Sequence, residues 1–173
     1  MTSNFSTKSL LTLLYEHKIS VNECLECIKP KTGVLKFKKT DEKAVLPVKA
    51  GENEVGYDLY VIKKVKKIGK LTWMYDTGIA VEPPEGYFTY LYPRSSVAKT
   101  GYMMSNSCGI IDPTYRGSLK LCLTKIDDTL PDIKLPCKIA QLVVSTFCRT
   151  KSVEHTTLSN TKRGDGGFGS TNK

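Results

Sequence analysis

The sequence predicts an all-β fold, a sandwich or barrel of antiparallel strands with almost no helix in its main domain. Short apolar runs of strand length recur between residues 34 and 147, and turn-forming Gly, Pro, Asp and Asn residues separate them. Such spacing is typical of antiparallel sandwiches and barrels. The composition agrees, because 173 residues with 40% hydrophobic and 25% charged side chains suit one globular domain with a short appendage.

Three regions are expected along the chain. The strands are predicted at residues 34–37, 59–62, 78–81, 88–92, 119–123 and 139–147. Before them, apolar residues repeat at helical spacing, and Ser20 followed by Glu23 fits a capping box. After them the chain turns polar and ends in a glycine-rich tail. We therefore expect a short helical N-terminal extension at 1–33, a β domain at 34–160 and a mobile C-terminal arm at 161–173.

The chain is basic, with 26 Lys and Arg against 17 Asp and Glu and a formal charge of +9. This excess indicates a polyanionic partner, either a nucleic acid or a phosphorylated small molecule, although a lysine-coated surface explains it equally well. The lysine run at 63–67 is expected to protect a strand edge rather than to bind nucleic acid. The two histidines are too few for a histidine-rich metal site or a histidine-driven triad.

Other features concern the compartment. No apolar run reaches the ~20 residues of a membrane-spanning helix, and the first residues lack the pattern of a signal peptide. Four of the six cysteines lie in strand-like runs, where buried reduced thiols are expected. These features predict a protein of the cytoplasm or nucleus that is not secreted and binds no membrane.

The tail carries the first cluster suited to a phosphate. Arg163 is followed by four glycines within six residues, by Phe168 and by two hydroxyls, Ser170 and Thr171. Glycine lets backbone N–H groups approach anionic oxygens, and arginine and hydroxyls supply further donors. A Walker loop is excluded because the Gly-Lys-Ser/Thr ending is missing. We expect the tail to be mobile when empty and ordered by a ligand, with Phe168 stacked on a flat base.

Two further clusters lie in the β domain. Arg94 with the hydroxyls of Ser95 and Ser96 forms a second credible phosphate cradle at a turn. Asp112 follows three strand-like residues and precedes a proline, so its carboxylate is expected at a strand end. A carboxylate fixed there can orient and deprotonate water, although a plain turn aspartate is the alternative. Three of the four arginines thus fall in glycine- or hydroxyl-rich loops, which points to a phosphorylated ligand.

In chain order, five segments resemble the motifs of the trimeric all-β dUTP diphosphatase (dUTPase) family. They read AGENEVGYDLY at 50–60, PRSS at 93–96, GIIDPTYRG at 109–117, IAQL at 139–142 and RGDGGFGST at 163–171. Five matches in order are far more specific than one, and together they span about residues 35–173. The resemblance implies a distorted jelly-roll-like β-barrel or sandwich. It also implies hydrolysis of dUTP to dUMP and pyrophosphate, which keeps uracil out of DNA and supplies dUMP for thymidylate synthesis.

The same resemblance implies roles for individual residues. Asp112 would orient the water that attacks the α-phosphate in line, and Tyr115 would lie against the deoxyribose and exclude a 2′-hydroxyl. The other substrate-binding residues divide by the part of dUTP that they would serve: for uracil, Asn106, Gly109, Ile110, Lys120 and Phe168; for the α- and β-phosphates, Arg94, Ser95, Ser96 and Gln141; for the γ-phosphate, Arg163, Ser170 and Thr171. Ile111 and Gly169 would also bind the substrate.

The resemblance further implies a cofactor and an assembly. Mg²⁺ would be bound to the triphosphate, with Asp58 reaching the metal through water. The protein would be a homotrimer whose sites are shared between subunits, the arm of one chain closing the site of a neighbour. No specific nucleic-acid binding is expected.

Two other functions remain open. A dCTP deaminase of the same fold would carry a glutamate ten residues after Asp112, where this chain has Cys122, and such enzymes tend to lack the tyrosine found at 115. A non-catalytic protein that senses dUTP or binds nucleic acid is the third possibility. The presence of Asp112, Tyr115 and the whole tail argues against lost catalysis but leaves room for an additional regulatory role.

Overall fold

The computed structural model describes residues 33–167, which form ten β-strands and one short 3-10 helix. The strands are β1 (Lys36–Lys39), β2 (Gly56–Val61), β3 (Lys63–Lys67), β4 (Thr72–Asp76), β5 (Ile79–Glu82), β6 (Tyr87–Pro93), β7 (Tyr102–Met104), β8 (Gly109–Ile111), β9 (Lys120–Lys125) and β10 (Cys137–Thr146), and the helix is η1 (Ser95–Lys99). The predicted all-β fold is confirmed. The helical extension expected at 1–33 lies, except for Gly33, outside the described residues.

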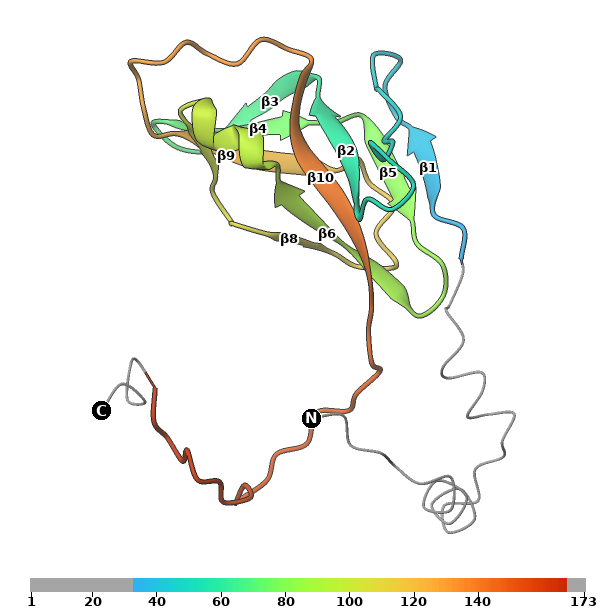
Figure 1. Cartoon of the computed structure of the whole chain (residues 1–173), viewed down its shortest axis with the longest axis vertical. Helices are drawn as coiled ribbons and strands as arrows, with labels where there is room; N and C mark the ends of the chain where they lie inside the picture. Colours follow the sequence, from blue (N-terminus) through green and yellow to red (C-terminus); the bar gives the residue numbers. More distant parts are fainter. Residues whose placement is uncertain (1–32, 168–173) are drawn as a thin grey trace.

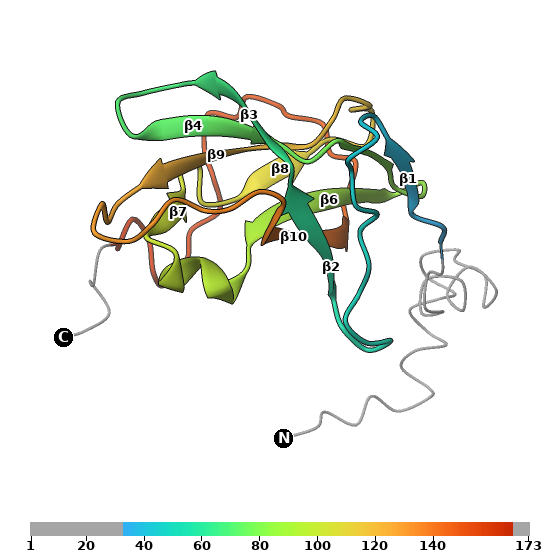
Figure 2. The same ribbon diagram turned by 90° about the horizontal axis from the view of Figure 1, so that it is seen from above.

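Eight of the strands form two antiparallel sheets of four, in the orders β2–β10–β6–β8 and β3–β4–β9–β7. Figure 2 shows them as two layers, with β3, β4 and β9 above β6 and β10. The remaining strands, β1 and β5, pair with each other at the side of the sandwich.

The core lies between the two layers and consists of the side chains that point inward at alternate positions along each strand. Along β6, for example, Thr89 and Leu91 are buried, whereas Phe88, Tyr90 and Tyr92 between them are only half-buried on the outer face. The fully buried large side chains come from both sheets: Leu59, Val61, Leu91, Ile139 and Leu142 from one, Tyr75, Leu121 and Leu123 from the other. Burial of each such side chain contributes about 1.5–3 kcal/mol relative to exposure.

All six predicted strand runs overlap a strand of the structure, and the lysine run is β3, at the edge of its sheet, as predicted. The sequence prediction missed β4 and β7. β7 has only three residues, and the residues of β4 do not alternate clearly between buried and exposed positions. The four described cysteines are free but less buried than expected, since Cys148 is exposed and the others are half-buried.

Beyond β10 the chain leaves the β domain. Residues 146–165 are all exposed, and Figure 1 shows this segment running away from the sandwich. The last ion pair with the domain joins Arg149 Nη2 to Glu85 Oε1 at 3.3 Å. Among the described residues beyond it, hydrogen bonds are internal to the segment, such as Arg163 Nε to the Gly166 carbonyl at 2.9 Å. No helix within residues 33–167 is long and apolar enough to cross a membrane.

Candidate active site

A polar pocket of about 290 Å³ lies on the outer face of the sheet that contains β2, β10 and β6. Its lining residues are Ala50, Glu54, Gly56, Asp58, Arg94, Ser95 and Gln141. Strand pairing brings them together, because Gln141 in the central strand β10 lies opposite Asp58 on one side and Tyr92 on the other. Residues from three distant segments of the sequence thereby share one face. We call this site the phosphate pocket.

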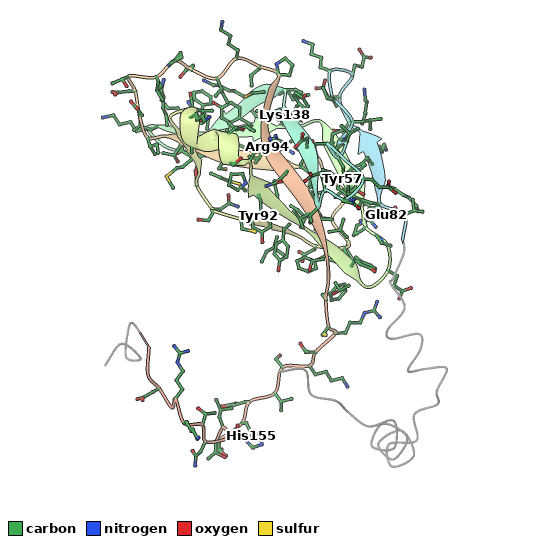
Figure 3. All side chains as sticks on the ribbon, in the orientation of Figure 1. Tyr57, Glu82, Tyr92, Arg94, Lys138 and His155 are labelled. Atoms are coloured by element: carbon green, nitrogen blue, oxygen red, sulfur yellow. The ribbon has the colours of Figure 1, made fainter. Side chains whose placement is uncertain are left out.

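The centre of the phosphate pocket is a carboxylate held between two cations. One oxygen of Asp58 pairs with Arg94 Nη1, and the other lies 3.1 Å from Lys138 Nζ. The side chain of Asp58 is only 9% exposed, so the two cations supply the partners that a buried charge requires. Figure 3 shows Arg94 and Lys138 close together beside β10. The cluster of three side chains carries a net charge of +1.

A β-bulge directs Lys138 into this cluster. The register of β10 against β2 shifts between Lys138 and Ala140, so one extra residue is inserted at that point. Side chains three residues apart in a regular strand point to opposite faces, and the extra residue turns Lys138 to the face of Gln141. The sequence prediction missed Lys138, because it lies just outside the matched IAQL segment and no sequence signal marks the bulge.

Two details leave room for a ligand beside the cluster. A Cβ atom on Gly56 would lie 2.4 Å from Gln141 Oε1, so glycine at this position gives the glutamine side chain its space. Arg94 Nε is buried and has no hydrogen-bond partner within residues 33–167. A buried donor without a partner is costly, and an anionic ligand would satisfy it. Both serines are exposed at the start of η1, and only Ser95 lines the pocket.

The predicted catalytic aspartate lies elsewhere in the chain. Asp112 is exposed at the end of β8, and its carboxylate makes no hydrogen bond or ion pair with any of residues 33–167. The preceding residue, Ile111, pairs with Thr89 of β6. In this antiparallel register Asp112 lies toward Phe88, six residues before Arg94, so at ~3.3 Å per residue Asp112 and Arg94 lie roughly 20 Å apart along the strand direction. One chain therefore holds the phosphate pocket and the carboxylate as separate parts.

The segment of residues 112–119, which we call the carboxylate turn, is stabilised by hydrogen bonds from its side chains to its own backbone carbonyl groups. Tyr115 Oη donates to the Ser118 carbonyl at 3.1 Å, and a Cβ on Gly117 would lie 2.4 Å from that hydroxyl. Arg116 Nη1 donates to two carbonyls of the turn and its Nε lies 3.6 Å from Glu82, so this arginine supports the turn. The hydroxyl end of the tyrosine ring thus lies close to the backbone of Gly117.

Buried polar groups anchor the end of the carboxylate turn to the fold. Ser118 Oγ donates to Asp76 Oδ1, which also accepts from the Gly78 amide at 2.9 Å. Thr77 Oγ1 donates to the Leu119 carbonyl at 2.9 Å. Asp76 and Thr77 are buried, so these bonds fix the turn against the β4–β5 connection. The sequence prediction missed both residues, because their importance depends on a contact across about 42 residues.

The residues predicted to bind uracil surround the carboxylate turn. Gly109–Ile111 forms the outermost strand of one sheet, and Lys120 begins β9 in the other sheet. The two strands do not pair with each other, because each belongs to a different sheet. The outer edge of β8 therefore has no strand partner within residues 33–167, and its backbone groups are available to a base.

The loop before β8 holds the remaining uracil candidate. Asn106 Nδ2 donates to the Cys108 carbonyl at 3.3 Å, and Ser107 between them has a positive φ of 56°. Tyr92 lies against this loop, and its hydrogen bond with Cys108, together with burial, raises the pKa of the tyrosine. In the arm, Arg163 is exposed, and Phe168, Gly169, Ser170 and Thr171 lie outside the described residues.

The described residues contain no group of three or more His, Cys, Asp or Glu side chains that could cage a metal ion. Both oxygens of Asp58 are occupied by cations. What the fold presents instead is a β-sandwich with a cationic pocket suited to phosphate and a separate exposed carboxylate. These are the parts of an all-β protein that handles a phosphorylated small molecule.

Comparison with known proteins gives the family. Residues 42–172 match the model of the dUTPase family. Deoxyuridine 5'-triphosphate nucleotidohydrolases are similar: the protein from Hydrogenobaculum sp. is 42% identical, covering 79% of this chain and 96% of the relative, and that from Arabidopsis thaliana is 39% identical, covering 79% and 81%. The dUTPase of Staphylococcus bacteriophage 80alpha, in a structure with dUPNHPP, has a TM-score of 0.67 at 26% identity over 80% of this chain and 98% of its own. The chain belongs to the dUTPase family.

Proposed function

We propose that this chain hydrolyses dUTP to dUMP and pyrophosphate, and that the phosphate pocket and the carboxylate turn are the two halves of its active site. The observation that carries the proposal is membership of the dUTPase family, with all five motif segments inside the matched residues 42–172. The relatives named deoxyuridine 5'-triphosphate nucleotidohydrolases act on the same substrate. The four free described cysteines suit a reducing cytoplasm or nucleus.

Asp112 acts on the attacking water. The water oxygen attacks the α-phosphorus in line, the bond from phosphorus to the α–β bridging oxygen breaks, and pyrophosphate leaves with that oxygen. Asp112 orients the water and accepts its proton. An exposed carboxylate without a cation partner in residues 33–167 is free to do so.

The phosphate pocket holds the leaving group. Arg94 offers a planar guanidinium to the α- and β-phosphates, and Ser95, Ser96 and Gln141 add neutral donors. Asp58 keeps the guanidinium in place through its ion pair. Mg²⁺ arrives on the triphosphate as part of the substrate, since this metal retains waters and is readily held by phosphate oxygens. Asp58 can reach that metal through a water, because each of its oxygens has a second acceptor site besides the one facing its cation.

The carboxylate turn selects the nucleoside. The free edge of β8 and the backbone near Lys120, together with Asn106, present N–H and C=O groups to uracil. Cytosine would leave such groups mismatched, and a site built on hydrogen bonds discriminates strongly against that. Tyr115, held against Gly117, leaves no room for a 2′-hydroxyl.

The two halves come from different subunits of a homotrimer. A catalytic carboxylate and a phosphate-binding arginine that act on one α-phosphate must lie within about 10 Å of each other, less than the separation in one chain. The outer face of β6 supports an interface, because Phe88, Tyr90 and Tyr92 form a half-buried aromatic row beside Ile110, which is 67% exposed. The arm, directed away from its own domain, closes the site of a neighbour with Arg163, Phe168, Gly169, Ser170 and Thr171.

Release of pyrophosphate from dUTP, dCTP, dTTP and UTP tests the function. We expect release from dUTP alone, with Mg²⁺ present. No release from dUTP would contradict the proposal, and ammonia from dCTP would identify a deaminase instead.

A further inference from the structure

The edge of β3 is unlike the other sheet edges of this protein. β3 is the outermost strand of the sheet β3–β4–β9–β7, and no strand within residues 33–167 pairs with its outer side. At the other edges, β7 and β8 have only three residues each, and the edge of β2 is covered in part by a bridge between Val48 and Asp58. β3 has five residues, so it presents the longest unpaired edge of the two large sheets.

All the charged residues of this edge are positive. Residues 63–71 contain five lysines and no acidic residue. Lys63 pairs with Asp41 at 2.6 Å and Lys64 lies 3.7 Å from Asp132. Lys66, Lys67 and Lys70 have no acidic partner among the described residues. Three of the five lysines of this edge therefore carry a charge that no acidic group within residues 33–167 neutralises.

A bulge distributes these lysines on both faces of the edge. The register against β4 shifts between Lys64 and Lys66, so Lys64 and Lys67 lie on the face of Trp73, with their Nζ atoms 5.3 and 5.9 Å from its ring centroid. Lys66 lies on the opposite face. Val65, at the bulge, is 47% exposed. A chain lying along this edge would therefore meet a cation on each face and an apolar side chain between them.

We propose that the edge of β3 binds an acidic, extended peptide segment of a partner protein by strand addition. Such a segment forms main-chain hydrogen bonds with the unpaired edge, and its alternate side chains meet the groups on either face. Glutamates or aspartates on the segment neutralise Lys66, Lys67 and Lys70, while an apolar residue covers Val65. Pairing with the β3 edge of a second copy of this chain is excluded, because two lysine-rich edges repel each other.

A labelled peptide that alternates glutamate and valine tests the proposal on the full-length protein, with fluorescence anisotropy as the readout. We expect saturable binding that weakens by about tenfold or more in the Lys66→Gln/Lys67→Gln/Lys70→Gln variant. Methylation of alternate backbone amides of the peptide should weaken binding by a similar factor, about tenfold, because it removes main-chain donors. The matched control is the Lys134→Gln/Lys151→Gln/Lys162→Gln variant, which loses the same charge and should bind like the unmodified chain. Circular dichroism of each variant verifies folding.

Several results would overturn the proposal. They are absence of saturable binding, equal weakening in the two triple variants, and unchanged binding of the methylated peptide. Tighter binding of a dT oligonucleotide, or of vesicles containing phosphatidylserine, would assign the edge to that partner and reject strand addition. None of these readouts depends on nucleotide hydrolysis, so failure here leaves the proposed enzymatic function untouched.

Discussion

The phosphate pocket and the carboxylate turn differ in the burial and the pairing of their carboxylates. In the pocket, Asp58 is almost fully buried and paired with two cations, so its charges are satisfied by the chain itself. In the turn, Asp112 is exposed and has no partner within residues 33–167, and only the backbone around Tyr115 is fixed. The charges of the pocket are therefore paired on folding, whereas the turn presents an unpaired carboxylate to solvent.

This difference predicts how each half responds to mutation. Removing one member of a buried ion pair leaves an uncompensated charge and destabilises the fold. Removing an exposed carboxylate without a partner changes little in the folded state. Changes in the pocket should thus reduce stability and activity together, and changes in the turn should reduce activity alone.

Asp112→Asn should give the largest loss of activity. The amide keeps the shape of the carboxylate but cannot accept the proton of the water, so kcat should fall by about 10²–10⁴-fold. Binding of a non-hydrolysable dUTP analogue and the melting temperature should stay close to those of the unmodified chain. Steady-state pyrophosphate release, analogue titration and thermal melting measure the three quantities. Turnover near the normal rate would remove Asp112 from its role.

Arg94→Ala should reduce both properties. We expect kcat/KM to fall by about 10²-fold, as for loss of one donor to developing charge. The free energy of unfolding should fall by about 2 kcal/mol, below the usual range for a broken buried pair because Lys138 still neutralises Asp58. Denaturant unfolding followed by fluorescence measures the second effect. Full stability with low activity would show that the ion pair contributes nothing to the fold, and the contrast between the halves would then disappear.

Gly117→Ala tests the turn without touching charge. The new methyl group would overlap Tyr115 Oη, and the exposed ring should move aside and lose its hydrogen bond to the Ser118 carbonyl at a modest cost in stability. We expect discrimination of dUTP against UTP to fall by roughly tenfold, since the displaced ring no longer excludes the 2′-hydroxyl. Comparison of kcat/KM for the two nucleotides provides the measurement. Unchanged discrimination would mean that Tyr115 does not lie against the sugar.

Asp132→Asn, remote from both halves, should have the smallest effect on activity. Hydrogen bonds from Lys125 and Tyr102 lower the pKa of Asp132 to about 2. Because folding lowers the pKa of this carboxyl group, its ionised form stabilises the folded state at any pH above the ordinary pKa of 3.8. This contribution is lost as the pH falls through the lowered pKa of about 2. The variant should therefore have a lower melting temperature than the unmodified chain at pH 7, with unchanged kcat. This difference in melting temperature should shrink toward pH 2. A difference that grows on acidification would reverse the sign of this effect.

Local patterns predicted most of the fold but less of the site. Apolar runs between turns indicated six strands, and Arg94 and Ser95 could be found because an arginine beside two hydroxyls at a turn suits a phosphate. Gln141 was found only because its segment resembles a family motif. Lys138 could not, because its direction depends on a bulge in strand pairing. Asp76 could not either, because its role arises from a bond to Ser118, about 42 residues away. Contacts set by tertiary pairing leave no local trace in the sequence.

The central claim is that the two halves of the active site meet only between subunits. Co-refolding equal amounts of the Asp112→Asn and Arg94→Ala chains tests it directly, since each parent alone should retain only about 1% of the normal activity or less. If pocket and turn come from different chains, random mixing places an intact turn beside an intact pocket in about one quarter of the sites. We therefore expect pyrophosphate release from dUTP to recover to roughly 25% of the unmodified rate in the mixture. Activity no greater than the average of the two parents would contradict a shared site.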